Sequence, residues 1–274
     1  MSPNAEGYTG EVEVRGLRIA YETRGQGSPL LLLHGALGDH RVWRRQLDHL
    51  SEVHTVVAWD APGCGKSSDP EEDLDFSDYA DYLAGFIETI GLDRPHVLGL
   101  SFGGGLALEL YNQYPDIPRS LILASAYAGG AGSLPPEEVE ARLEQILRLS
   151  RATPEEVVET LISSMFTASV PEDVVEELAR IMRDFHPRGT RIMLRAFARA
   201  DLRGMLGTIH VPTLLIYGDD DERSPLSVAR ALHEAIPKSQ LVVIPDVGHA
   251  TNLEAPEAFD AAVREFLCEL ETGD

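Results

Sequence analysis

The 274-residue sequence has an ordinary globular composition but an unusual charge. Hydrophobic residues make up 43% and charged residues 25% of the chain, and its formal net charge is −22. Such a charge argues against nucleic acids and anionic membrane surfaces as partners, because a polyanion would be repelled. The first residues lack the basic start and apolar run of a secretory signal, and apolar runs such as Leu30–Leu33 are far too short to span a bilayer. We therefore expect a cytoplasmic protein.

Two cysteines, Cys64 and Cys268, are far apart in the chain and show no paired spacing. Neither a disulfide framework nor a cysteine-rich metal site is expected from them.

Strand-like and helix-like patterns alternate along most of the chain. In order, they predict a β-hairpin at 11–15 and 18–23, strands at 29–33, 54–59, 96–100 and 120–124, and helices at 41–50, 75–90 and 106–114. The pattern resumes with a strand at 212–217, a helix at 226–235, a strand at 240–244 and a closing helix at 256–270. This alternation predicts an α/β fold, with a mostly parallel central sheet flanked by helices.

Between these two parts lies a stretch that contains four helical patterns and no strand. Pro135, Pro154 and Pro171 stand near three of the helix starts, the last two after the possible N-caps Thr153 and Val170, of which only threonine is a good cap. We expect a core domain made of residues 1–133 and 207–274, interrupted by an all-helical insert at 134–206.

A serine stands at the junction between the strand at 96–100 and the helix that follows it. Gly99-Leu100-Ser101-Phe102-Gly103 fits the pattern G-x-S-x-G, which by itself also fits a plain turn. Between a strand and a helix, however, this pattern is typical of a sharp turn that exposes a serine hydroxyl above a helix N-terminus. Ser101 is therefore a candidate nucleophile.

A serine nucleophile needs a base, and the base needs a carboxylate. His249 follows the last predicted strand, where sites of open α/β sheets gather. Four acidic residues follow the strand at 212–217, and the candidates for the carboxylate are Asp219, Asp220, Asp221 and Glu222. With any of them the chain order is serine, acid, histidine.

Acyl transfer also requires donors for an oxyanion. The backbone N–H of Phe102, at the helix start, is the first candidate, and the N–H of Ala36 is the second. Ala36 lies in the small-residue loop His34–Gly38 after the strand at 29–33, in which His34 is expected to be structural.

Taken together, these marks resemble the α/β-hydrolase fold family over nearly the whole chain. They are Leu-His-Gly at 33–35, the motif Asp60-x-x-Gly-x-Gly-x-Ser67, the elbow at 99–103, Gly218-x-x-Asp221 and Gly248-His249. The resemblance selects Asp221 as the acid, identifies the insert at 134–206 as a cap over the active site, and requires no metal or organic cofactor. The segment 248–259 is similar to the end of oxoadipate enol-lactonases and related small esterases. Leu100 departs from the family, many members of which carry histidine there.

Two other motifs offer competing interpretations. Residues 63–67 end like a phosphate-binding loop, but Asp60 stands where that loop requires glycine. Asp60 itself could serve as the acid, although its place in the family motif favours a role in bracing the loop. Cys64 has no adjacent base and is expected to be a small buried residue.

The sequence thus predicts a serine hydrolase that cleaves small carboxylic esters or lactones through an acyl-enzyme, as a monomer or homodimer. The alternatives are a carbon–carbon bond hydrolase acting on ring-cleavage diketones, a cofactor-free haloperoxidase or perhydrolase, and a non-enzymatic small-molecule receptor on the same fold. Six apolar residues of the insert could line a pocket, although each is more typical of helix packing: Met165, Phe166, Met182, Phe185, Met193 and Phe197.

Overall fold

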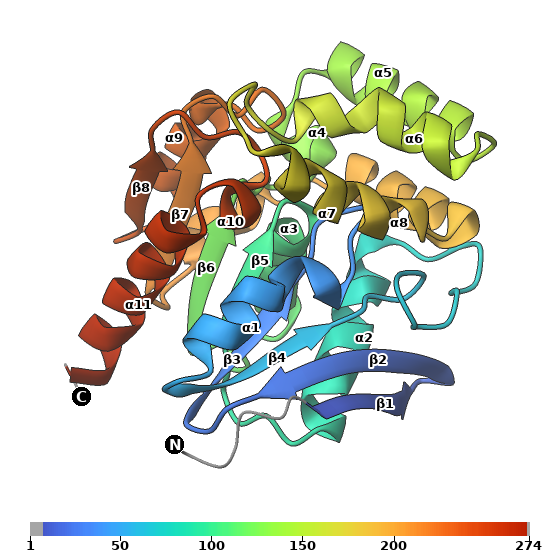
Figure 1. The fold of residues 1–274 in the computed structure, drawn as a ribbon. Coiled ribbons are helices and arrows are strands. Elements are labelled where there is room, and N and C mark those ends of the chain that lie inside the picture. The colour runs from blue at the N-terminus through green and yellow to red at the C-terminus, as the bar shows by residue number, and fades with distance from the viewer. Residues whose placement is uncertain (1–7, 273–274) are drawn as a thin grey trace.

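The predicted strands pair into one eight-stranded sheet in the computed structural model, which describes residues 8–272 (Figure 1). The strands are β1 (Tyr8–Val14), β2 (Leu17–Arg24), β3 (Ser28–Leu33), β4 (His54–Trp59), β5 (His96–Leu100), β6 (Ser120–Ala124), β7 (Thr213–Gly218) and β8 (Gln240–Ile244). Their order across the sheet is β1-β2-β4-β3-β5-β6-β7-β8. β2 pairs antiparallel with β1 and β4, and every other pairing is parallel. The α/β fold and the mostly parallel sheet are confirmed.

Helices cover both faces of this sheet, as the fully apolar strands require. Successive side chains of a strand point to opposite faces, so Leu31 and Leu33 join one buried cluster and Leu30 and Leu32 join the other. The first cluster includes side chains of α2 (Phe76–Thr89), α3 (Phe102–Gln113) and α9 (Leu226–Ala235). The second includes those of α1 (Arg44–Leu50) and α11 (Pro256–Thr272).

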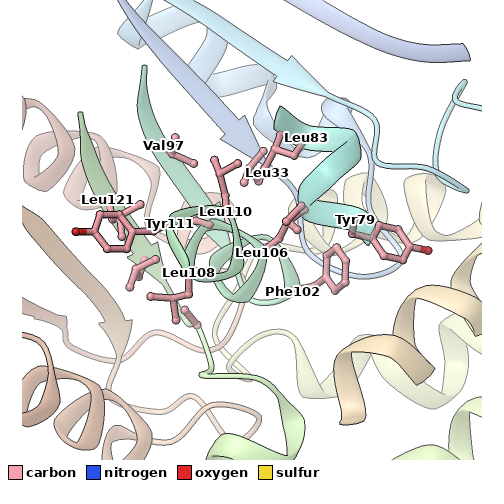
Figure 2. Close-up of a cluster of buried hydrophobic side chains, with 14 of the residues drawn as sticks. Leu33, Tyr79, Leu83, Val97, Phe102, Leu106, Leu108, Leu110, Tyr111 and Leu121 are labelled. Carbon is pink, nitrogen blue, oxygen red and sulfur yellow. The ribbon is translucent and has the colours of Figure 1, made fainter. Parts of the chain in front are cut away.

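The helix that follows the candidate nucleophile is buried along most of its length. Figure 2 shows its side chains, including Leu106 and Leu110, among strand residues such as Leu33 and Val97 and the α2 residue Leu83. Leu33, Leu83, Val97, Leu106 and Leu110 have no exposed surface. This close-packed core fixes α3, and with it the turn at its N-terminus, relative to the sheet.

The chain between β6 and β7 is helical, and Figure 1 shows its helices gathered beyond the end of the sheet at which β6 and β7 finish. They are α4 (Gly130–Ser133), α5 (Pro136–Leu149), α6 (Pro154–Leu161), α7 (Glu172–Arg183) and α8 (Pro187–Arg199). The remaining short elements are η1 (His40–Trp43), η2 (Ile162–Ser164), η3 (Arg203–Thr208) and α10 (Thr251–Glu254). No helix among residues 8–272 is both long and apolar enough to cross a membrane.

Some helix boundaries differ from those that the sequence predicts. The helix expected at 41–50 begins as the 3-10 turn η1. α3 begins at Phe102 instead of 106, because Gly103–Gly105, which carry no helical pattern, are needed for close packing. Thr153 caps α6 as predicted, through a capping box with Glu156. Val170 is not the cap of α7, since Pro171, held in an extended conformation, occupies that position.

Candidate active site

Ser101 occupies a strained turn between β5 and α3. Its backbone has φ 54° and ψ −111°, a region that non-glycine residues rarely adopt and that costs on the order of 1–3 kcal/mol. Hydrogen bonds on both sides hold it there. The Ser101 amide donates to the carbonyl of Ala124 on β6 at 2.8 Å, and the Ser101 carbonyl accepts from the amide of Gly104 at 3.0 Å. The sharp turn predicted from the sequence is confirmed.

Two of the motif's glycines are explained by close backbone approach. A Cβ at Gly99 would lie 2.2 Å from the carbonyl oxygen of Gly103, and a Cβ at Gly103 would lie 2.2 Å from that of Leu33. Neither clash can be relieved by a side-chain movement, because both neighbours are backbone atoms. The glycines therefore let the helix start press against the strands, and the serine projects from that junction.

His249 and Asp221 meet across the two loops that follow β7 and β8. The Nδ1 atom of His249 lies 2.9 Å from Asp221 Oδ2, and both residues are buried. Asp219 instead accepts a hydrogen bond from the Asp246 amide at 2.6 Å, so it braces the neighbouring loop. Of the four acidic residues at 219–222, Asp221 is the partner of the histidine.

Asp221 is ionised under ordinary conditions. Burial alone would raise the pKa of this carboxyl, but the adjoining His249 and the amide of Ser224, which donates to Asp221 Oδ1 at 2.8 Å, outweigh it and lower the pKa. The amide of Arg223 makes a further bond to the same oxygen at 2.9 Å. A fixed carboxylate in this position orients the imidazole and stabilises its protonated form.

The loop after β3 is arranged by the side chain of His34. Its Nε2 accepts from the Ala61 amide at 3.0 Å, and its Nδ1 lies 2.7 Å from the Gly35 carbonyl. Burial lowers the pKa of His34, in keeping with a neutral ring that accepts at one nitrogen and donates at the other. His34 is therefore structural, as expected, and the loop that it braces carries Ala36.

One cavity of about 130 Å³ brings the candidate residues together. It is bordered by Ser101, His249, Ala36 and Phe102, and by residues of the helical insert. Phe102 is the first residue of α3, and the first N–H groups of a helix have no partner within it. Four of the six apolar insert residues considered from the sequence also line the cavity: Met165, Met182, Phe185 and Phe197. Phe166 and Met193 are not among the lining residues.

Comparison with known proteins identifies the family to which this fold belongs. The family model of the α/β hydrolase fold matches residues 28–256. The chain belongs to the α/β-hydrolase fold family. This α/β-hydrolase is 26% identical over 253 residues to (E)-2-((N-methylformamido)methylene)succinate hydrolase of Acinetobacter baylyi, covering 90% of the chain and 93% of that protein.

Solved structures of the family superpose closely on this α/β-hydrolase. A thermophilic esterase from Thermogutta terrifontis, solved with malate bound, has a TM-score of 0.88 and 29% identity, covering 96% of this chain and 98% of that one. The enol-lactonase from Burkholderia xenovorans LB400 has a TM-score of 0.86 and covers 94% of this chain and all of that one. At 24% identity it shows a shared fold. The resemblance predicted from the motifs is confirmed.

Three arginines of this α/β-hydrolase, Arg142, Arg191 and Arg223, line the cavity, and the sequence does not predict them; two of them contact each other. Arg223 follows Asp221 by two residues, and Arg142 comes from α5. Arg142 donates to the carbonyl of Arg223 at 2.9 Å and to the hydroxyl of Tyr127 at 3.2 Å. Arginines are scattered through the sequence without a motif, so no pattern marks these two.

Glu254 fastens the loop that carries the histidine. Its carboxylate accepts from the Gly248 amide at 2.8 Å and from the Thr167 amide at 2.9 Å, and the Thr167 hydroxyl also donates to it. The Ala250 amide bonds to the Met165 carbonyl at 2.8 Å. The loop around His249 is thus bound to the insert. Glu254 belongs to the family-like segment 248–259, but its contacts could not be inferred from that likeness.

Asp60 acts as a brace within the core and does not contact the histidine of the site. It accepts hydrogen bonds from the amides of His40 at 2.8 Å and Lys66 at 2.9 Å, and from His40 Nδ1 at 2.7 Å. Asp39, His40 and Asp60 form the one group within residues 8–272 whose ligating atoms are close enough to hold a metal ion. Asp39 is bonded to Arg41, so protein donors already engage both carboxylates. Cys64 is buried, as predicted, and both cysteines are free.

Proposed function

We propose that this α/β-hydrolase is a serine hydrolase that cleaves small carboxylic esters or lactones through an acyl-enzyme. The observation that carries the proposal is a set of three groups, two of which line one largely apolar cavity while the third holds the second in place. They are a serine on a strained strand-to-helix turn, a buried histidine, and the carboxylate that holds this histidine. Esterases among the structural neighbours support the same class of substrate.

In the proposed reaction His249 takes the proton of Ser101 as the serine oxygen attacks the carbonyl carbon. The amides of Phe102 and Ala36 stabilise the oxyanion, and the positive N-terminus of α3 adds to that field. The bond to the alcohol oxygen breaks, and His249 returns the proton to the leaving alcohol. A water molecule, deprotonated by the same histidine, then attacks the acyl carbon. The bond from that carbon to Ser101 Oγ breaks, His249 returns the proton to Oγ, and the acid is released. Asp221 stays ionised throughout.

In this proposal residues 134–206 act as a cap that encloses the substrate. Phe197 of α8 packs against Phe102 with ring centroids 5.6 Å apart, so a cap side chain touches the residue next to the nucleophile. A cap that excludes water strengthens the electrostatic interactions at the reacting carbonyl. The choice of substrate would then depend on the cap residues that line the cavity.

The proposal is tested by the hydrolysis of p-nitrophenyl acetate and butyrate. We expect Ser101→Ala and His249→Ala to lose at least about a thousandfold in kcat, because the triad acts as a unit. Turnover of either variant at the wild-type rate would refute the serine mechanism.

The choice of acid is tested separately by two matched substitutions. Asp221→Asn should lower kcat by several orders of magnitude, whereas Asp219→Asn, two residues away on the same loop, should keep most of the activity. The opposite result would overturn the assignment of Asp221 alone. A panel of esters, lactones and vinylogous diketones then separates ester cleavage from carbon–carbon bond cleavage by the same residues.

A further inference from the structure

Arg223 is a cation in the wall of the cavity with no carboxylate partner among residues 8–272 within ion-pair distance. Its Nη1 donates to the hydroxyl of Ser164 at 2.9 Å, a neutral partner. The other two arginines of the cavity wall are neutralised. Arg142 pairs with Glu138 at 2.6 Å, and Arg191 pairs with Glu72 at 2.8 Å.

The surroundings of Arg223 make an unpaired charge costly. Burial, followed by the nearby charge of Arg142, lowers the pKa of Arg223. The guanidinium remains charged at neutral pH, because arginine is not deprotonated in proteins. A charge removed from water is ordinarily compensated by an opposite charge or by a full set of hydrogen bonds. The protein holds a cation here among apolar side chains. The Asp221 carboxylate attracts it from beyond ion-pair distance, but that carboxylate is already bonded to His249, so within residues 8–272 no carboxylate pairs with the guanidinium.

We propose that Arg223 binds a carboxylate carried by the substrate, at the end of the acyl chain away from the bond that is cleaved. The inference rests on the proposed function and narrows its substrate class to half-esters or lactones of dicarboxylic acids. Arg142 is a positioning residue in this scheme. It donates a hydrogen bond to the carbonyl of Arg223 and so fixes the backbone that carries the guanidinium.

A carboxylate fits this site better than a bulkier anion. The planar guanidinium presents paired N–H donors that match the two oxygens of a carboxylate. The cavity around it is bounded mainly by apolar residues such as Leu134, Val139 and Leu149, which suit the methylene chain of a dicarboxylic acid. The global charge of −22 repels anions, so recognition of one requires a local cation of this kind.

The test compares mono-p-nitrophenyl adipate with its methyl ester, which differs in charge but hardly in shape. We expect wild-type protein to prefer the acidic ester, and Arg223→Met to reduce the ratio of the two kcat/KM values by roughly tenfold to a hundredfold. Arg230→Met, at an exposed position on α9, should keep the wild-type ratio. Because the backbone amide of residue 223 still donates to Asp221, the substitution leaves that hydrogen bond in place.

A second test uses wild-type protein alone, so its result does not depend on whether a variant folds. Adipate should inhibit hydrolysis of the methyl ester competitively, and more strongly than adipamide, which has the same chain and carries no charge. Equal inhibition by adipate and adipamide, or an unchanged ratio in a folded Arg223→Met protein, would overturn the inference.

The two proposals fail in distinguishable ways. In one case the methyl ester is turned over in a way that depends on Ser101, and the acidic ester is not preferred. The serine hydrolase mechanism is then supported and the carboxylate site is refuted. If neither ester is turned over, the proposed function fails. The carboxylate site is then decided by whether adipate raises the melting temperature of wild-type protein and leaves that of Arg223→Met unchanged.

Discussion

At the scale of single residues, the candidate site depends on backbone hydrogen bonds that place side chains in unfavourable positions. Ser101 keeps a positive φ because β6 and the first turn of α3 fix its amide and carbonyl. Asp221 remains charged although it is buried, because amides and His249 satisfy its oxygens. In each case the strained or buried group is surrounded by well-ordered elements, which is how such groups are tolerated at functional sites.

His40 gives a prediction about pH at this scale. Burial opposes its protonation, but the Asp60 carboxylate, 2.7 Å from Nδ1, raises the pKa of His40 above its ordinary value of about 6.5. A raised pKa contributes stability that is complete below the ordinary value and is lost as the pH rises through the raised one. The free energy of unfolding of wild type relative to His40→Gln should therefore decrease between about pH 6 and pH 9, by up to about 1.4 kcal/mol per unit of pKa shift.

Urea unfolding over that pH range measures this difference. A difference between wild type and His40→Gln that grows with pH would contradict the assigned direction of the shift.

At the scale of elements, the short helix α10 links the loop of His249 to the insert. Glu254, its last residue, accepts from Gly248 on one side and Thr167 on the other. Its removal would free both segments, although within residues 8–272 Glu254 forms no hydrogen bond with Ser101 or Asp221. Displacement of a catalytic group by about 1 Å can cost about a hundredfold in rate.

We therefore expect Glu254→Ala to lower kcat for p-nitrophenyl butyrate by roughly tenfold to a hundredfold, with a much smaller change in KM. Glu254→Gln keeps one acceptor oxygen and should recover part of the loss. Glu257→Ala, an exposed position on α11, is the matched control. A rise in KM with unchanged kcat would show that Glu254 shapes the substrate pocket and does not position the histidine.

The elements were largely predictable from the sequence, and their contacts were not. Strands buried on both faces, such as β3, read as continuous apolar runs, and G-x-S-x-G between a strand and a helix located Ser101. The start of α3 was missed because three glycines carry no helical pattern, although close packing demands them. The run of acidic residues at 219–222 offered no periodic signal, so Asp221 was selected by resemblance alone. The side chains of Arg223 and Glu254 bond to residues that are distant in the sequence, so no local pattern reveals these contacts.

At the scale of the whole molecule, two electrostatic effects oppose each other. The excess acidic side chains, which give a net charge of −22, repel one another and so destabilise the compact state. Exposed ion pairs between the insert and the core act in the other direction, for example Arg191 with Glu72 and Arg41 with Asp184, both at 2.8 Å. Exposed pairs contribute about 0–1 kcal/mol each, and salt weakens them as it weakens the repulsion. The sign of the salt dependence shows which effect is larger.

We expect the repulsion to be larger than the effect of the ion pairs, because acidic residues outnumber basic ones by 45 to 23. Raising NaCl from about 20 mM to about 300 mM at neutral pH should then increase the melting temperature, by about 2–4 °C for each kcal/mol of repulsion that is screened. Near pH 4.7, the isoelectric point calculated from the sequence, the net charge vanishes, and the same salt step should leave the melting temperature unchanged or lower it. A fall at neutral pH would mean that the ion pairs between insert and core outweigh the global repulsion. In that case Glu72→Gln, which removes a partner of Arg191, should reduce the fall.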